Sequence, residues 1–196
     1  MSSVAHRSSA QLYLAQEVIT TTLMKILVSL LLLIVSSPTF AALKPGALAP
    51  QLVAPAALAG KSFEYNLANA LKRGPVVLYF FPAAFTQGCT LETREFVENH
   101  SAFRKAGATV IGVSTDTIET LKRFSIEECR GKFPVVSATP VILTAFDAKL
   151  SLGTRANRVS YVITSDRQVI HTYDALDYRL HVSSALAAVQ RWKKRK

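Results

Sequence analysis

The sequence predicts an α/β domain with a central mixed β-sheet, helices on both faces and an N-terminal β-hairpin. Two uninterrupted apolar runs, residues 76–81 (VVLYFF) and 109–114 (TVIGVS), are typical of strands buried on both faces. Each is followed by a segment of helical periodicity. Later, two alternating runs at 159–164 and 169–173 flank the polar turn 165–168 and predict an antiparallel hairpin. Alternating strands and helices followed by a hairpin indicate a mixed sheet covered on both sides.

Local signals place the elements around the first strand. Gly60 and residues 63–65 predict a small hairpin near the start of the domain. After the first buried run, we expect a helix from about Thr90 to Lys105, because Gly107 then provides a stop.

The second buried run is followed by another helix signal. Asp116, with Glu119 three residues later, resembles a capping box and predicts a helix to about Arg130, with Gly131 as its stop. The remaining expected elements are a short strand at 133–136, a short helix at 140–146 and a final amphipathic helix at 177–192.

The N-terminal residues are interpreted as a targeting signal that precedes the folded domain. Residues 26–35 (ILVSLLLLIV) carry no charge, follow Lys25, and are too short to cross a bilayer but suit a signal-peptide core. We expect a signal peptide at 24–41, cleaved after Ala41, and export to the periplasm or the medium. Residues 1–23 are interpreted as an extension upstream of the true start. The alternative is a retained membrane anchor formed by the same hydrophobic segment.

Composition and charge exclude several classes of protein. Hydrophobic residues make up 49% of the 196-residue chain and charged residues 18%, which excludes a disordered protein. The net charge is +10. Removal of residues 1–41 takes away two basic residues and one acidic residue, leaving +9 on 42–196, and five of the remaining basic residues lie in the tail 191–196. Because no aromatic residues alternate with basic ones in the body of the domain, nucleic-acid binding is not expected.

Cys89 lies where the first buried strand gives way to a helix. Free backbone N–H groups and the helix dipole in a first helical turn favour the thiolate, which is the reactive form of cysteine. Thr86 can direct a hydroxyl toward the same place, and Pro82, which lacks an N–H, can exclude water from one side. By position alone, Cys89 is either an activated thiol or a buried structural cysteine.

The residues around Cys89 resemble the active-site signature of the peroxiredoxins. Pro82, Thr86 and Cys89 match the family pattern P-x-x-x-[T/S]-x-x-C, and Arg158 opens a segment (RVSYVI) similar to the family's R-x-x-[F/Y]-[V/L]-I strand. The resemblance extends from about Gly46 to the C-terminal helix and is greatest to the Q-type, or bacterioferritin-comigratory-protein, branch. It implies a thioredoxin-like fold and a thiol-dependent peroxidase in residues 42–196.

The resemblance also implies roles for individual residues. Cys89 would be the peroxidatic cysteine, whose thiolate attacks the peroxide and becomes a sulfenic acid. Thr86 and Arg158 would stabilise the charge that develops on the peroxide oxygens. Pro82 would shield the thiolate, and Glu92 would orient the arginine.

The second cysteine departs from the commonest Q-type pattern. Many members carry a resolving cysteine five residues after the peroxidatic one, where this chain has Arg94. Cys129, expected late in the helix after the second strand, is therefore the candidate resolving cysteine. It lies on an apolar stripe, so filling the core and forming a permanent structural disulfide with Cys89 remain alternatives.

No cofactor or metal is expected. His100, His171 and His181 are scattered without metal-ligand spacing, and the chain has no glycine-rich phosphate loop. The expected partners are a peroxide substrate and an external thiol reductant such as a thioredoxin-like protein, and the enzyme would be a monomer or a homodimer. The alternatives are a thiol–disulfide oxidoreductase, which the absence of C-x-x-C disfavours, and a non-enzymatic secreted domain with a structural disulfide.

Overall fold

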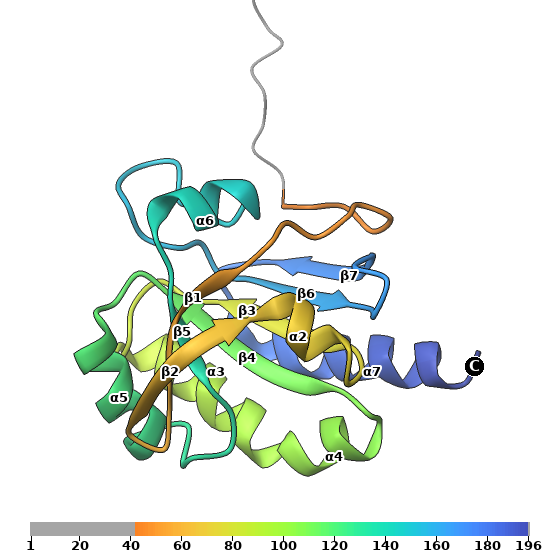
Figure 1. Ribbon diagram of the computed structural model, residues 1–196, viewed down its shortest axis with the longest axis horizontal. Helices are drawn as coiled ribbons and strands as arrows, with labels where there is room; N and C mark the ends of the chain where they lie inside the picture. Colours follow the sequence, from red (N-terminus) through yellow and green to blue (C-terminus); the bar gives the residue numbers. More distant parts are fainter. Residues whose placement is uncertain (1–41, 196) are drawn as a thin grey trace, which may run out of the picture. The chain divides into compact units, whose positions relative to one another are not determined.

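The computed structural model describes residues 42–195, which form a seven-stranded mixed sheet in the order β2-β1-β5-β4-β3-β6-β7 (Figure 1). Parallel pairing joins β3 to β4 and β4 to β5, and the other neighbours are antiparallel. The strands are β1 Val53–Leu58, β2 Lys61–Asn66, β3 Val76–Phe80, β4 Thr109–Ser114, β5 Val135–Ser137, β6 Val159–Ile163 and β7 Val169–Asp174. The predicted fold class, including both hairpins, is confirmed.

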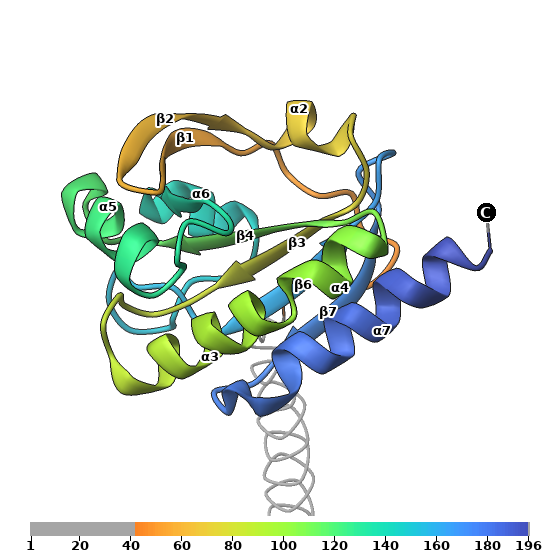
Figure 2. The same cartoon turned by 90° about the horizontal axis from the view of Figure 1, so that it is seen from below.

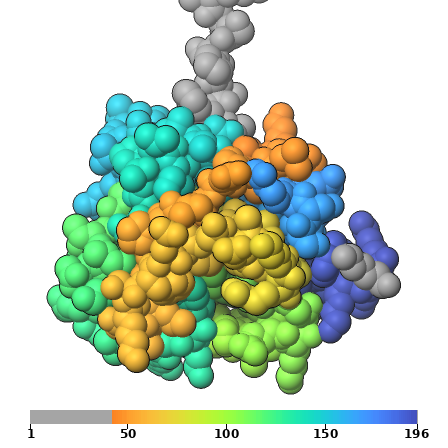
Figure 3. Space-filling model, in the orientation of Figure 1, coloured from red at the N-terminus to blue at the C-terminus, as the bar shows by residue number. Residues whose placement is uncertain are grey.

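Helices cover both faces of the sheet. Figure 2 shows α3, α4 and α7 along one face, whereas α2 and α6 contribute to the apolar cluster on the other. In space-filling form, the β1–β2 hairpin and α2 make up much of the face turned to the viewer (Figure 3). The helices are α2 Leu67–Leu71, α3 Gln87–Glu98, α4 His100–Lys105, α5 Ile118–Glu127, α6 Pro140–Ala145 and α7 His181–Lys193, with a 3-10 turn, η1, at Tyr178–Leu180.

The central strand β3 divides its side chains between two apolar clusters. Val76, Leu78 and Phe80 contribute to the cluster under α2 and α6, and Val77 and Tyr79 to the cluster under α3, α5 and α7. All five are fully buried. Since successive residues of a strand point to opposite faces, an apolar run without alternation is what a strand covered on both sides requires.

The expected single helix from Thr90 to Lys105 is wrong in its extent. Helix α3 begins at Gln87, and the helical conformation is interrupted at Asn99 before α4 begins. The Asn99 side-chain amide donates to the Glu95 carbonyl at 2.9 Å, and the Asn99 backbone N–H donates to the same oxygen. A side chain that competes for a helical carbonyl favours a helix end, which accounts for the break.

The second helix is also corrected at both ends. Thr117, not Asp116, caps α5, because the Thr117 hydroxyl accepts from the Thr120 N–H. The helix ends at Glu127, and Arg130 and Gly131 adopt left-handed backbone conformations with φ of 49° and 64°. Cys129 therefore lies in the turn after α5 and not late in the helix.

Among residues 42–195, no helix is long and apolar enough to cross a membrane. The expected extension at 1–23 and signal peptide at 24–41 lie outside the described residues, as does Lys196 at the end of the basic tail. These expectations therefore stay predictions.

Candidate active site

The loop between β3 and α3 is held in place by Asp116. One carboxylate oxygen of Asp116 accepts from the Ala84 N–H at 2.7 Å and from the Ser114 hydroxyl at 2.8 Å. Phe85 adopts a positive φ of 62°, and its ring packs against Phe124 on α5. The carboxyl end of β4 thus fixes the segment that leads into the cysteine helix, a role that sequence reasoning did not assign to Asp116.

Cys89 is the third residue of α3 and is only 1% exposed. Thr86 is the N-cap residue of this helix, and its hydroxyl donates to the Ala83 carbonyl at 3.0 Å. Pro82 is half-buried in the loop that precedes it. The thiol therefore sits among the unpaired N–H groups of a first helical turn, where an anion is stabilised.

Arg158 brings a cation to the sulfur from a distant part of the chain. It lies immediately before β6, is 6% exposed, and places Nη2 3.5 Å from the Cys89 Sγ. Gly88 makes room for it, because a Cβ at that position would lie 3.2 Å from Nη2. A permanently charged guanidinium at this distance stabilises a thiolate and can donate to a peroxide oxygen.

Glu92 lies one helical turn after Cys89, so both face the same buried space. Its Oε2 accepts a hydrogen bond from Arg158 Nη1. Glu92 is fully buried, and this burial raises the pKa of its carboxyl to about 8 although Arg158 opposes the shift. Burial disfavours the charged form of a carboxyl group, which is the physical cause of the higher pKa.

His181 joins this cluster, although sequence reasoning treated it as a scattered histidine. It is the first residue of α7 and is fully buried. Its Nδ1 lies 2.8 Å from the Ser160 Oγ and 3.6 Å from the Glu92 Oε1. Burial lowers the pKa of the imidazole to about 4. The only sequence signal was its place at the start of an amphipathic helix, which does not reveal the partner.

Cys129 is fully buried in the apolar cluster that also contains Cys89, and both cysteines are free thiols. Burial raises the pKa of the Cys129 thiol well above its ordinary value. Its neighbour Glu128 forms an ion pair with Arg94 of α3 at 2.9 Å. Arg94, five residues after Cys89, therefore connects the cysteine helix to the turn that carries Cys129.

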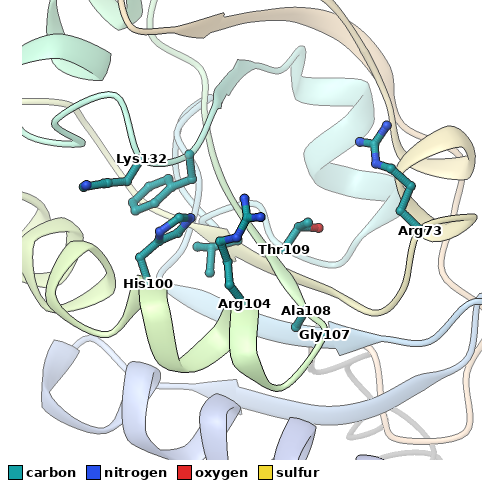
Figure 4. A pocket seen from close by; sticks show the side chains of 9 residues that line it. Arg73, His100, Arg104, Gly107, Ala108, Thr109 and Lys132 are labelled. Carbon is teal, nitrogen blue, oxygen red and sulfur yellow. The ribbon is translucent and has the colours of Figure 1, made fainter.

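A separate basic pocket of about 330 Å³ lies at the amino end of β4 (Figure 4). Its polar lining includes Arg73, His100, Arg104, Thr109 and Lys132. Cys89 follows the carboxyl end of β3, which runs parallel to β4, so the two sites lie at opposite ends of these strands. Within residues 42–195, no group of three or more histidine, cysteine or acidic side chains could hold a metal ion.

A buried cysteine in a first helical turn, held by an arginine on a thioredoxin-like sheet, defines the class of thiol-based redox proteins. A family model described as the AhpC/TSA family matches residues 45–172. The chain belongs to this family, the peroxiredoxins, and is a thiol-dependent peroxidase that reduces hydroperoxides.

Individual relatives agree with this assignment. The chain is 33% identical over 130 residues to a Mycobacterium tuberculosis protein assigned to the peroxiredoxins, a match that covers 64% of this chain and 84% of that protein. It is 30% identical over 105 residues to peroxiredoxin Bcp of Escherichia coli, covering 50% and 67% of the two chains. The crystal structure of peroxidoxin BcpB from M. tuberculosis superposes with a TM-score of 0.70 at 29% identity, covering 76% and 97%. The expected family, fold and activity are confirmed.

Proposed function

We propose that Cys89 is the peroxidatic cysteine of this peroxidase, with Arg158, Glu92, Thr86 and Pro82 around it. The observation that carries the assignment is the Arg158 guanidinium 3.5 Å from the Cys89 sulfur in a first helical turn. The thiolate attacks one peroxide oxygen, so that an S–O bond forms and the O–O bond breaks. The products are the Cys89 sulfenic acid and an alkoxide or hydroxide, which takes up a proton and leaves as alcohol or water.

Within this proposal, the other residues act on position and charge. Arg158 stabilises both the thiolate and the leaving oxygen, and Glu92 holds Arg158 through the hydrogen bond between Nη1 and Oε2. The Thr86 hydroxyl is available to a peroxide once it leaves the Ala83 carbonyl, and Pro82 limits the access of water.

We propose that Cys129 resolves the sulfenic acid. Its sulfur attacks the Cys89 sulfur, an S–S bond forms, and the sulfenic oxygen leaves as water. An external dithiol of the thioredoxin-like class then reduces the disulfide and is itself oxidised. Because both cysteines belong to one chain, the cycle can proceed in a monomer or within each subunit of a homodimer. Both sulfurs are buried, so the first turn of α3 and the turn after α5 must rearrange for them to meet.

Intact-mass measurement tests both roles. Reduced protein treated with one equivalent of hydrogen peroxide is expected to lose two hydrogens, and Cys89→Ser is expected to show no change. Cys129→Ser is expected to gain one oxygen at Cys89, which a sulfenic-acid reagent traps. Retained peroxidase activity in Cys89→Ser would contradict the first role. Normal turnover of Cys129→Ser with a small thiol, without an intermolecular disulfide, would contradict the second.

We further propose that the protein is exported after cleavage behind Ala41. The support is the uncharged run 26–35 behind Lys25, followed by the small residues Thr39 and Ala41 at the −3 and −1 positions. N-terminal sequencing of the full-length gene product from its native host tests this. A start at Ala42 in the extracytoplasmic fraction is expected. A chain that retains residues 26–35 in the membrane fraction would support the anchored alternative instead.

A further inference from the structure

The hydrogen bonds of His181 determine its tautomer. Its Nε2 lies 2.9 Å from the backbone carbonyl oxygen of Ala175, which can only accept a hydrogen bond. Nε2 must therefore carry a hydrogen. In the neutral ring, Nδ1 then has a lone pair and acts as an acceptor. The Tyr173 ring packs edge-on against the imidazole at 4.7 Å between centroids, which helps to keep it in this orientation.

The two oxygens of Glu92 have different partners. Oε2 accepts from Arg158, whereas Oε1 is buried and has no hydrogen-bond partner among the residues that the structure describes. Oε1 faces His181 Nδ1 at 3.6 Å, slightly beyond hydrogen-bond length. Because Nδ1 carries no hydrogen, it accepts from the Ser160 hydroxyl at 2.8 Å and has no hydrogen to offer Oε1. An ionised carboxylate would therefore bury a negatively charged oxygen without a hydrogen-bond donor among the described residues, and one proton on the carboxyl removes that charge.

The charge of the whole cluster points to the same conclusion. If Cys89 is a thiolate and Glu92 is ionised, the buried cluster with Arg158 carries a net charge of −1. Burying a net charge is unfavourable. If a proton is held beside Glu92, the thiolate and the guanidinium balance each other and the cluster is neutral. The positive charge of Arg158 is then directed at the sulfur and is not neutralised by the carboxylate.

We propose that the Glu92–His181 pair keeps one proton at neutral pH, and that His181, by offering Oε1 no hydrogen, is a positioning residue for the peroxidatic site. The proposal rests on the role of Cys89 proposed above. Burial acts on the two groups in the directions that this arrangement needs, because it raises the pKa of Glu92 to about 8 and lowers that of His181 to about 4. The proton therefore resides mainly on Glu92.

Several charged or titratable groups surround this pair and enter its pH dependence. They are Cys89 and Glu95 from α3, Arg158 from the segment before β6, His171 and Tyr173 from β7, and Asp177 before η1. Arg158 and His171 oppose protonation of His181, and Asp177 favours it. Since Asp177 forms an exposed ion pair with Arg179, its effect on the buried ring is offset.

Nuclear magnetic resonance of the reduced protein tests the proton count without peroxide. The expected result at neutral pH is one proton on the pair, with a neutral Nε2–H imidazole and a protonated Glu92 carboxyl that ionises at about pH 8. His181→Asn and Glu92→Gln assign the two signals by their loss. A neutral imidazole beside an ionised carboxylate at neutral pH would overturn the proposal. This readout does not involve turnover, so it is independent of whether Cys89→Ser abolishes activity.

The pH profile of the peroxide reaction provides a second test. In the native protein, the rate constant is expected to fall on the order of tenfold above pH 8, because an ionised Glu92 then balances the positive charge of Arg158. Glu92→Gln cannot ionise, so the falling part should disappear. His181→Asn offers Oε1 an amide N–H that favours the carboxylate, so the fall should move to lower pH.

A matched control separates this effect from a structural one. His100→Asn changes a half-buried histidine on α4, and its rate constant should fall above pH 8 as that of the native protein does. If His181→Asn lowers the rate constant equally at every pH, its role is structural and the proposal fails. A native profile that stays level above pH 8 would also overturn it.

Discussion

Gly88 sets the space between the cysteine helix and Arg158. A Cβ at this position would lie 3.2 Å from Arg158 Nη2, closer than most side-chain contacts. The guanidinium has little freedom to withdraw, because its other nitrogen is bound to the buried Glu92. The absence of one side chain therefore allows the arginine to reach the sulfur.

We accordingly expect Gly88→Ala to separate stability from activity. Alanine in a helix is favoured over glycine by about 1 kcal/mol, so the free energy of unfolding should not fall. The displaced guanidinium should lower the rate constant for peroxide roughly tenfold. Stopped-flow kinetics and urea unfolding measure the two effects. Gln87→Ala, an exposed change in the same helical turn, is the control and should leave the rate unchanged. A full rate in Gly88→Ala would show that Arg158 adapts.

At the scale of elements, an ion pair connects α3 to the turn after α5. Arg94 and Glu128 lie 2.9 Å apart, and their side chains are 49% and 12% exposed. Such a partly exposed pair contributes about 0.2–1 kcal/mol. It holds the turn that carries Cys129 in its buried, reduced arrangement.

Arg94→Gln should therefore speed disulfide formation after oxidation of Cys89, by about two- to fivefold. Rapid-quench alkylation followed by mass measurement gives the rate. Arg123→Gln removes the ion pair between Arg123 and Glu127, which both lie on α5. This change should have no comparable effect on the rate of disulfide formation. Added salt should bring the native rate toward that of Arg94→Gln, because exposed charges are screened. An unchanged rate in Arg94→Gln would mean that this ion pair does not limit the rearrangement.

A second prediction at this scale concerns the close packing of β4 against β3 and β5. A Cβ on Gly112 would lie 2.8 Å from the Tyr79 hydroxyl oxygen and 3.0 Å from Val135 Cγ1. Gly112→Ala should lower the free energy of unfolding by about 1–3 kcal/mol, as measured with urea. Tyr79→Phe removes the hydroxyl, so its combination with Gly112→Ala should recover part of the loss in a double-mutant cycle. Strict additivity of the two changes would refute the contact.

At the scale of the whole molecule, the buried acid and base shape the pH dependence of stability. The pKa of Glu92 is raised to about 8, so its folded form keeps a proton that the unfolded form has lost, and stability falls as pH rises toward 8. The pKa of His181 is lowered to about 4, so its contribution falls as pH drops below 6.5. In acid, Glu92 and His181 change stability with pH in opposite directions. Between pH 6.5 and 8, only Glu92 of the two changes stability with pH.

In that window, the free energy of unfolding should fall by at most about 1.4 kcal/mol per pH unit. Glu92→Gln, which does not titrate, should flatten the slope. Urea unfolding at several pH values measures this, and Glu98→Gln on the exposed face of α3 is the matched control. A slope that is the same in Glu92→Gln would place its origin in other groups.

The sequence by itself determined the mixed sheet, its two hairpins and the position of Cys89 at a helix start, because apolar runs, turn residues and local spacing act over a few neighbouring residues. The resemblance to the peroxiredoxins also implied that Glu92 orients Arg158. Tertiary structure decided the rest. The contacts of Arg158 with Cys89, and of His181 with Glu92, join residues 69 and 89 positions apart, and α7 packs against both α3 and β6. No local pattern carries such pairings, so only the folded chain shows that His181 faces the carboxyl group that holds the arginine.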